Sequence, residues 1–433
     1  MAPDYVAWFR SSTPYINAHR GKIFVLMFGG EAIEHDNFAH IIHDIALLNT
    51  LGVKLVLVHG SRPQIDRCMA RRQLSIRFHR GRRVTEQPAL ECVKEASGSL
   101  RAELEALLSM GLPDSPMHRS RIRVTGGNFV IAKPLGVLDG IDHAHTGEVR
   151  RVQGGDIARQ LELGHIVLIS PLGYSPTGEI FNLSMEEVAI EVATSLKADK
   201  LIAFDHAAGL LDNDGRLLRE LRLGEARQLL ESTTDAHSHQ LLEALVRSSG
   251  AGIERCHLIS YADNGALIKE LFTRDGCGSL IHRDSYESIR TADIDDVAGI
   301  LALIQPLEEE GVLVRRSREL LENEIHRFTV IERDGMVISC AALYPFTEEG
   351  TAEIACVATH PDYRGGGRGE RVLAHLEKQA RQLSLGRLFV LTTRTAHWFM
   401  EQGYAPGSTQ DLPQARQRLY NYRRNSQIFC KSL

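Results

Sequence analysis

The sequence predicts an α/β domain with a mainly parallel sheet, followed by a smaller α+β domain. Short continuous apolar runs alternate with helical periodicity over the first two-thirds of the chain, as in parallel sheets covered by helices on both faces. In the last third, Arg333-Asp-Gly335 separates two apolar runs, which indicates a β-hairpin. A further strand, a glycine-rich turn, a helix and another strand then predict a β–helix–β unit.

The elements of the first domain begin with a strand, a helix and a second strand. Residues 22–28 form a continuous apolar run, which predicts a strand buried on both faces. Apolar residues at helical spacing predict a helix over 38–51, and residues 54–59 form the next buried strand. A right-handed parallel crossover is expected for such a unit. Further strands are expected at 165–170, 200–205, 257–261 and 276–281, with a helix over 188–196.

The second domain begins after a change of pattern near residues 282–287. Its hairpin strands are expected at 328–332 and 336–343, because each is a short run rich in apolar and β-branched residues. The later elements are expected to be a strand at 353–357, a helix over 372–383, a strand at 388–393 and a helix over 396–402.

Length and composition are those of a soluble globular protein. The 433 residues suffice for two or three domains, and 43% are hydrophobic and 24% charged. A net charge of −5 gives no bias toward nucleic acid or anionic membranes, so neither partner is expected. No apolar run approaches the roughly 18–20 residues of a spanning helix. The pattern divides the chain into an N-terminal helical arm (1–20), a first domain (21–282), a linker (283–286) and a second domain (287–433).

Cysteine and histidine usage bear on compartment and metals. The seven cysteines are widely spaced without a C-x-x-C motif, and the first twenty residues do not form a signal peptide. We therefore expect a reduced, cytoplasmic protein. The nineteen histidines form no H-E-x-x-H or similar cluster, so no metal is expected.

The most informative motif is the glycine-rich turn Arg364-Gly-Gly-Gly-Arg-Gly369 between a buried strand and an amphipathic helix. Glycines lack a Cβ atom, so several backbone N–H groups can converge on one anion. The positive end of the following helix would add to this attraction. The turn is therefore a candidate phosphate cradle, and the alternative is a glycine-rich turn without a ligand.

With this motif, residues 287–433 resemble the GNAT acetyltransferase superfamily. The resemblance implies acetyl-CoA as co-substrate, with its pyrophosphate on the R-x-x-G-x-G loop. It also implies that the preceding strand splays from its neighbour, so that free backbone groups hold the pantetheine arm and the acetyl carbonyl. The implied CoA-binding residues are Ala355, Cys356, Val357, Arg364, Gly365, Gly366, Gly367, Arg368 and Gly369.

The whole chain resembles the bacterial N-acetylglutamate synthase family, in which a kinase-like domain precedes a GNAT domain. An acceptor amine is protonated at neutral pH and must lose a proton before it attacks a thioester. Glu353 is our candidate base, directly or through water, and it could instead be an exposed strand-end carboxylate. Many GNAT enzymes use a tyrosine where Phe399 stands here, which puts the usual acid in doubt. The resemblance favours Thr392 as proton donor, and His397 is the alternative.

Glutamate, the acceptor that the resemblance implies, carries two carboxylates. Arginine binds a carboxylate with two parallel hydrogen bonds and stays charged. The resemblance points to Arg316 and Arg424, with the Ser426 hydroxyl and the Cys356 backbone as further contacts. Either arginine could instead be a solvated surface charge. No histidine–carboxylate pair is evident beside Cys356, so we expect direct transfer without an acyl-cysteine.

Residues 21–282 resemble the amino-acid kinase fold, a three-layer αβα domain, and acetylglutamate kinase in particular. Kinases of that family carry Lys-x-Gly-Gly after the first strand, and here Met27 replaces the lysine. Their His-Gly-Gly-Gly loop is here His59-Gly-Ser-Arg62, with a bulky arginine. Phosphoryl transfer depends on such positioned charges, so we expect a regulatory domain without kinase activity.

The resemblance further implies L-arginine as a feedback inhibitor and a homo-oligomer, with a hexamer favoured. Trp8 and Phe9 of the arm are consistent with a surface for a partner subunit, and they could equally pack on their own domain. Glu270 would pair with the guanidinium of arginine, and Tyr15 would stack on it. The positions that match the family's arginine site are Tyr15, Lys200, Glu270, Gly276, Gly278 and Ser279.

The resemblance thus implies an enzyme that transfers acetyl from acetyl-CoA to L-glutamate, the first step of arginine biosynthesis. One alternative is a non-catalytic arginine sensor, which would not need the intact R-x-x-G-x-G loop. Another is an acetylglutamate kinase with a fused domain, against which Met27 argues. The general acid, the sign of the arginine effect and the oligomer size stay open, and glutamate as acceptor depends on the resemblance.

Overall fold

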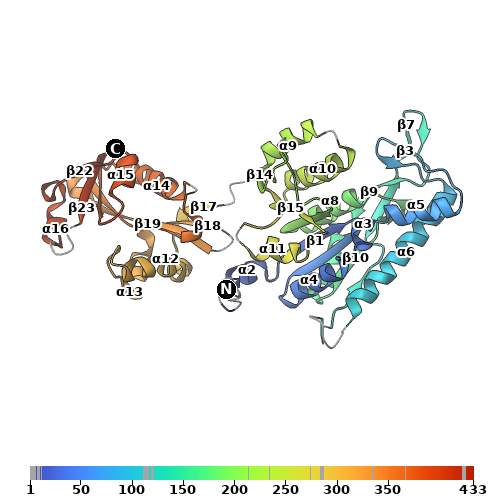
Figure 1. Cartoon of the computed structure of the whole chain (residues 1–433), viewed down its shortest axis with the longest axis horizontal. Helices are drawn as coiled ribbons and strands as arrows, with labels where there is room; N and C mark the ends of the chain where they lie inside the picture. Colours follow the sequence, from blue (N-terminus) through green and yellow to red (C-terminus); the bar gives the residue numbers. More distant parts are fainter. Residues whose placement is uncertain are drawn as a thin grey trace. The chain divides into compact units, whose positions relative to one another are not determined.

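The chain forms two compact units, Met1–Ser285 and Tyr286–Leu433, in a computed structural model (Figure 1). The predicted linker 283–286 and the predicted partner residues Trp8 and Phe9 lie outside the described residues. The structure describes residues 6, 10, 12–110, 117–118, 121–212, 214–233, 235–273, 275–282, 287–333, 336–365, 367–421 and 426–433.

The first unit is built on an eight-stranded sheet. Its paired strands are parallel except for β15 and β16, which run antiparallel, so the prediction of a mainly parallel sheet is confirmed. The six strands expected from the apolar runs are all present. Across the sheet the order is β14 (Glu220–Arg222), β16 (Ser279–His282), β15 (Arg255–Ser260), β13 (Lys200–Asp205), β1 (Ile23–Phe28), β2 (Lys54–His59), β10 (Ile166–Ile169) and β5 (Val124–Thr125).

Helices cover both faces of this sheet and enclose two separate cores. Side chains of β1 alternate between them: Val25 and Met27 join one core, whereas Phe24, Leu26 and Phe28 join the other. This confirms the three-layer αβα fold. The helices of the first core are α7 (Gly154–Glu162), α8 (Met185–Leu196), α9 (Leu223–Ser232) and α10 (Ala236–Gly250). Those of the second are α3 (Gly30–Ile33), α4 (Phe38–Thr50), α6 (Gln87–Ser109) and α11 (Ala266–Phe272), with α2 (Thr13–His19) and α5 (Arg62–Arg71) beside them.

Smaller sheets between residues 78 and 182 were not expected from the sequence. Their strands have two to six residues and lack the continuous apolar runs of the main sheet, because many of their side chains face solvent. One sheet has the order β12 (Ile180–Asn182), β11 (Leu172–Tyr174), β6 (Val130–Pro134) and β9 (Gly147–Val152), and two ribbons pair β3 (Phe78–His79) with β4 (Arg82–Arg83) and β7 (Val137–Leu138) with β8 (Ile141–Asp142).

The second unit contains a seven-stranded sheet. Its pairs are antiparallel except for β20 and β21, which α14 connects as a parallel crossover. The predicted hairpin is confirmed by the pairing of Arg333 with Met336, while its turn, 334–335, lies outside the described residues. The order is β17 (Ser288–Thr291), β18 (Phe328–Arg333), β19 (Met336–Phe346), β20 (Thr351–Thr359), β21 (Arg387–Thr392), β23 (Gln427–Ser432) and β22 (Ala405–Gly407).

Helices lie on both faces of this second sheet as well, which confirms the α+β prediction. The helix after the glycine-rich turn packs on one face, through Val372, Leu373 and Leu376. A second core on the opposite face includes Val297, Ile300 and Leu321. The helices are α12 (Val297–Glu309), α13 (Arg318–Glu324), α14 (Arg368–Gln382), α15 (Ala396–Glu401) and α16 (Gln414–Arg418).

The seven cysteines are free thiols. Within the described ranges, no helix is long and apolar enough to cross a membrane. No three His, Cys, Asp or Glu side chains among those same residues are grouped so that they could hold a metal ion.

Candidate acyltransferase site

The site is built where two parallel strands part. The ladder between β20 and β21 covers only Thr351–Ile354 against Arg387–Val390, although both strands continue. Beyond Ile354, the backbone of β20 therefore no longer has β21 as a partner on that side. Free N–H and C=O groups in such an opening can pair with an extended ligand. The expected splay of the strand is present in the structure.

A β-bulge directs side chains at this opening. Cys340 pairs with Ala358 while Ala342 pairs with Ala355, so β20 has one extra residue there. Cys356 adopts a φ of +54°, a left-handed conformation that is uncommon outside glycine. As a result, the successive residues Ala355 and Cys356 both face the α12 side of the sheet. Burial raises the pKa of the Cys356 thiol to about 12, which keeps it protonated and a poor nucleophile.

The glycine-rich turn leads into α14 through Gly367, whose φ is +71°. Gly365 is also left-handed, with a φ of +79°, and Gly366 lies outside the described residues. Both described glycines have open space where a Cβ would stand. Glycine is therefore favoured at these two positions by the left-handed backbone and not by a lack of space. The helix that follows has fifteen residues, and the N–H groups at its start point out of its end.

The two arginines of the motif differ. Arg368 is held by Glu287, with Nε to Oε1 at 2.7 Å, and its guanidinium lies 5.3 Å from the centre of the Tyr363 ring. Its charge is therefore already paired. Arg364 is exposed, and its Nε donates to the Thr359 carbonyl oxygen at 3.4 Å. Gly369 differs from the other glycines, because a Cβ there would lie 3.0 Å from the Trp398 ring.

The candidate base Glu353 lies on β20, just before the opening, and is 9% exposed. Arg416 binds both of its carboxylate oxygens: Nε donates to Oε2 at 2.6 Å and Nη2 donates to Oε1 at 3.1 Å. The sequence did not predict this partner, because Arg416 lies in a polar stretch without a recognisable pattern. Glu353 is therefore a buried, paired carboxylate and not an exposed strand-end charge.

Arg316 and Tyr344 lie near Glu353 on the same side of the sheet. Tyr344 is the cross-strand partner of Glu353, and its hydroxyl donates to Glu324 at 2.8 Å. Burial and this carboxylate raise the pKa of the Tyr344 phenol well above its usual range. Burial alone would lower the pKa of Arg316, but the nearby Cys356, Tyr344 and Glu353 raise it. The predicted Arg316 therefore belongs to the group of charges around the opening.

The candidate proton donors have different surroundings. Thr392, at the end of β21, is buried, and its Oγ1 accepts the Thr395 N–H at 3.0 Å and lies 2.7 Å from the Thr395 hydroxyl. His397 is exposed on α15. Phe399 is buried in the core beside Tyr404. A phenylalanine side chain has no hydroxyl that could donate a proton.

Ser426, one of the residues expected to bind the acceptor, directly precedes Gln427, the cross-strand partner of Thr392. Ser426 is buried just before β23, and its carbonyl oxygen accepts the Tyr420 hydroxyl at 2.7 Å. Arg424 lies outside the described residues.

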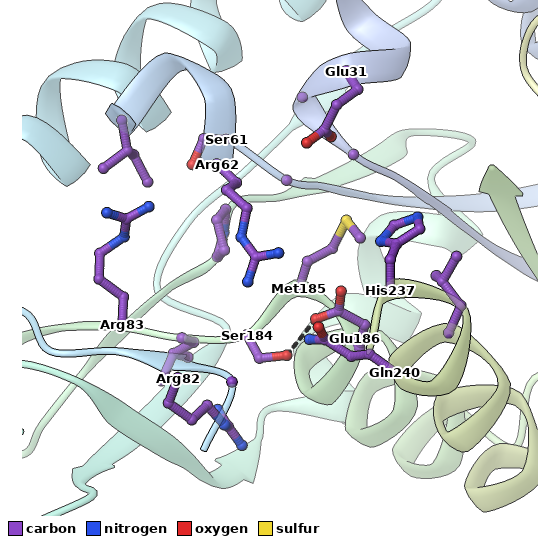
Figure 2. A pocket seen from close by; sticks show the side chains of 18 of the residues that line it. Glu31, Ser61, Arg62, Arg82, Arg83, Ser184, Met185, Glu186, His237 and Gln240 are labelled. Atoms are coloured by element: carbon purple, nitrogen blue, oxygen red, sulfur yellow. Dashed lines mark hydrogen bonds between the residues drawn. The ribbon is translucent and has the colours of Figure 1, made fainter. Parts of the chain in front are cut away.

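The first unit contains a cleft of about 370 Å³ at the carboxyl ends of β1, β2 and β13 (Figure 2). Open α/β sheets bind ligands at this edge. Met185 and Arg62 point into the cleft, and a Cβ at Gly60 would lie 3.1 Å from the Met185 sulfur. Met27, in the position of the kinase lysine, is buried in the core. The Glu31 carboxylate contacts Gly29, where a phosphate would have to approach.

Comparisons with known proteins match each unit to a known family. Residues 22–260 match the amino acid kinase family, and residues 297–404 match the acetyltransferase (GNAT) family. The chain is 56% identical over 430 residues to an amino-acid acetyltransferase of Azotobacter vinelandii, which covers 99% of this chain and all of that protein. The chain belongs to the amino-acid acetyltransferase family. A Pseudomonas aeruginosa member is 53% identical over 431 residues, which is 100% of both chains.

Solved structures are similar to this acetyltransferase chain over nearly its whole length. N-acetylglutamate synthase from Neisseria gonorrhoeae, complexed with coenzyme A and L-arginine, is 38% identical, with a TM-score of 0.88 and 99% of each chain covered. The same enzyme complexed with coenzyme A and N-acetylglutamate has a TM-score of 0.63 at the same identity and coverage.

The residues predicted to bind L-arginine include Glu270, a buried carboxylate with several hydrogen-bond donors. Glu270 accepts hydrogen bonds from His257 Nδ1 at 2.7 Å and from the N–H groups of Cys277 and Gly278 at 2.8 and 2.9 Å. Burial would raise the pKa of Glu270, but these donors hold it near 2. Three bonds leave about one free acceptor position of the roughly four on a carboxylate. The sequence missed His257, which a strand pattern does not distinguish from a core residue.

The other residues predicted to bind L-arginine belong to the same unit. Burial lowers the pKa of Lys200 well below its usual range, and its Nζ lies 5.7 Å from the centre of the Phe24 ring. Ser279 Oγ donates to the Leu218 carbonyl oxygen at 2.5 Å, which ties β16 to the segment before β14. Gly276 is left-handed, and the Glu270 carboxylate lies against it. Tyr15 of α2 packs on the core that also contains Cys277.

Proposed function

We propose that this protein transfers the acetyl group of acetyl-CoA to the amine of L-glutamate and releases CoA and N-acetyl-L-glutamate. The observation that carries the proposal is the open edge of β20, between a glycine-rich helix start and a buried carboxylate. The backbone of Ala355 to Val357 would hold the pantetheine and the acetyl carbonyl. The turn from Arg364 to Gly369 would bind the pyrophosphate.

In this proposal the chemistry needs one base and one hydrogen-bond donor. Glu353 accepts a proton from the ammonium group of the acceptor, directly or through water, and the free amine attacks the thioester carbonyl. The C–S bond then breaks, and the sulfur leaves with the electron pair. Thr392 or His397 supplies a hydrogen bond or a proton to that sulfur. Arg316, Arg424 and Ser426 would hold the acceptor's carboxylates.

The regulation that we propose places L-arginine in the first unit, with Glu270, Lys200, Tyr15 and the 276–279 turn around it. Arginine would act as feedback inhibitor of the first step of its own synthesis, and the protein would be a cytoplasmic hexamer. Met185 and Glu31 line the cleft at the carboxyl ends of the strands and lie close to Gly60 and Gly29, which supports a first unit without kinase activity.

The experiment that tests this function measures thiol release from acetyl-CoA with L-glutamate, L-aspartate, L-glutamine or no acceptor. We expect release that depends on L-glutamate and yields one N-acetylglutamate per CoA by mass spectrometry. Equal release with and without every acceptor would contradict the proposal. Loss of turnover in Thr392→Val but not in His397→Ala would assign the donor to Thr392.

A further inference from the structure

The ion pair between Glu353 and Arg416 is more than a surface contact. The Glu353 side chain is 11% exposed and that of Arg416 is 23% exposed. Each carboxylate oxygen accepts one guanidinium N–H, so the geometry is that of a bidentate pair. A shielded pair of this kind interacts more strongly than an exposed one. In this state the proposed base faces a cation and not an acceptor amine.

Further ionisable groups lie near this pair, on β19, on β20, on α12 and in and before α13. Arg316 approaches Glu353 from the segment before α13, and Tyr344 stands opposite on β19. Cys356 follows on β20, and Glu308 and Glu324 lie near its thiol. An ammonium group that enters here alone would meet two guanidinium groups. An acceptor that also carries a carboxylate would balance them.

We propose that Arg416 is an acceptor-binding residue, and that a carboxylate of the acceptor displaces Glu353 from it. This inference depends on the proposed function. Before binding, the pair is Arg416 with Glu353. After binding, the pairs are Arg416 with the acceptor carboxylate and Glu353 with the acceptor ammonium, so no charge is left unpaired. An amine without that carboxylate would free Glu353 only by leaving Arg416 shielded and unpaired, which is unfavourable.

The exchange prepares the base for its step. With the ammonium at Glu353, one proton passes from nitrogen to the carboxylate. The nitrogen lone pair forms a bond to the acetyl carbon, the C–S bond breaks, and the electron pair leaves with the CoA sulfur. Acceptor selection and activation of the base are then one event.

The position of Arg416 in the fold allows this exchange. α16 is a five-residue helix within the long connection from β22 to β23 and contributes no strand to the sheet. It is attached by the Gln414 N–H to both Glu349 carboxylate oxygens at 3.2 Å, and by Gln417 Nε2 to the Leu412 carbonyl oxygen at 2.7 Å. The Arg416 guanidinium can therefore change partner without disturbing β20. The same connection continues to Ser426, which we expect in acceptor binding.

The test compares Arg416→Gln with Arg418→Gln, since Arg418 is an exposed residue of the same helix. For each, kcat/KM is measured with L-glutamate, with 4-aminobutyrate, which lacks the α-carboxylate, and with L-glutamine, whose side chain is neutral. We expect Arg416→Gln to lower the preference for glutamate over at least one analogue by tenfold or more. The analogue concerned shows which acceptor carboxylate Arg416 binds. It is the α-carboxylate if the analogue is 4-aminobutyrate and the side-chain carboxylate if it is L-glutamine. Arg418→Gln should keep the preference of the unsubstituted protein.

Several outcomes would overturn the inference. One is an Arg416→Gln variant that keeps both preferences within about twofold. Another is a variant that binds CoA normally but turns over no acceptor, since Arg416 would then only position Glu353. If Arg416→Gln does not fold, Arg416→Lys is used, and an unchanged KM for glutamate would contradict the exchange. Absence of glutamate-dependent release by the unsubstituted protein would contradict the proposed function itself.

Discussion

At the scale of single residues, Glu353 and Cys356 of β20 differ in the chemistry that their surroundings allow. Glu353 is a carboxylate paired with Arg416, and in our proposal it accepts a proton after the acceptor has displaced it from that partner. Cys356 is a buried thiol whose pKa burial raises to about 12. The surroundings of these two side chains thus favour general-base catalysis by Glu353 over covalent catalysis by Cys356.

Replacing Glu353 by Gln should lower kcat/KM for L-glutamate by about 10²–10⁴-fold, the usual contribution of a positioned base. The amide has the same shape but accepts no proton at neutral pH. The assay is thiol release under subsaturating glutamate, and calorimetry should show CoA binding unchanged. Glu348→Gln is the control, because Glu348 is an exposed carboxylate in the turn before β20. An equal loss of kcat/KM in both variants would show that Glu353 is not the base.

At the scale of elements, the start of α14 depends on backbone conformation. Gly367 has a φ of +71° and open space around it, so an alanine there is disfavoured by its dihedral angle and not by a clash. We expect Gly367→Ala to destabilise the fold by about 1 kcal/mol and to weaken CoA binding several-fold. Calorimetry and thermal unfolding measure the two effects.

Gly350 supplies the matched control, since its φ is +60° and its surroundings are equally open. Gly350→Ala should lower the melting temperature to a similar extent and leave the CoA dissociation constant unchanged. Equal weakening of CoA binding in both alanine variants would mean that the turn at Gly367 has no special part in binding.

The docking of α2 should depend on pH through His19. Its Nε2 lies 2.8 Å from the Leu271 carbonyl oxygen of α11, and burial together with Lys200 lowers its pKa to about 3. Only the unfolded chain binds a proton there between pH 6.5 and 3, so stability falls as pH falls below 6.5. The expected loss from pH 7.5 to 5 is about 2 kcal/mol. Hydrogen exchange of the β1 and β13 amides measures this loss of stability. In His19→Asn, stability should change less between pH 7.5 and 5.

The sequence predicted the elements whose patterns are local and long. The apolar runs that became β1, β2 and β13 are recognisable because both faces of those strands are buried. The short strands β3, β4, β6 to β9, β11 and β12 lack such runs and were missed. In the site, Glu353 and the glycine-rich turn follow from the strand–turn–helix pattern. Arg416 and His257 do not, because their roles depend on contacts across 63 and 13 residues of sequence.

At the scale of the whole molecule, the proposal assigns chemistry to one unit and control to the other. L-Arginine should lower turnover of the unsubstituted protein, and Glu270→Gln should reduce that effect at least tenfold, because a neutral amide binds a guanidinium weakly. Activity without arginine should persist. Glu243→Gln, on the exposed side of α10, is the control. Full arginine sensitivity in Glu270→Gln would place the inhibitor elsewhere.

The central claim is direct transfer of acetyl from acetyl-CoA to glutamate without a covalent enzyme intermediate. Its most direct test is a single turnover with excess protein, acetyl-CoA labelled in the acetyl group, and L-glutamate, quenched at successive times. We predict that the label passes from acetyl-CoA to N-acetylglutamate in equal amount, and that no acid-stable label appears on the protein. Label on Cys356, or label that stays in acetyl-CoA while glutamate is present, would contradict the account.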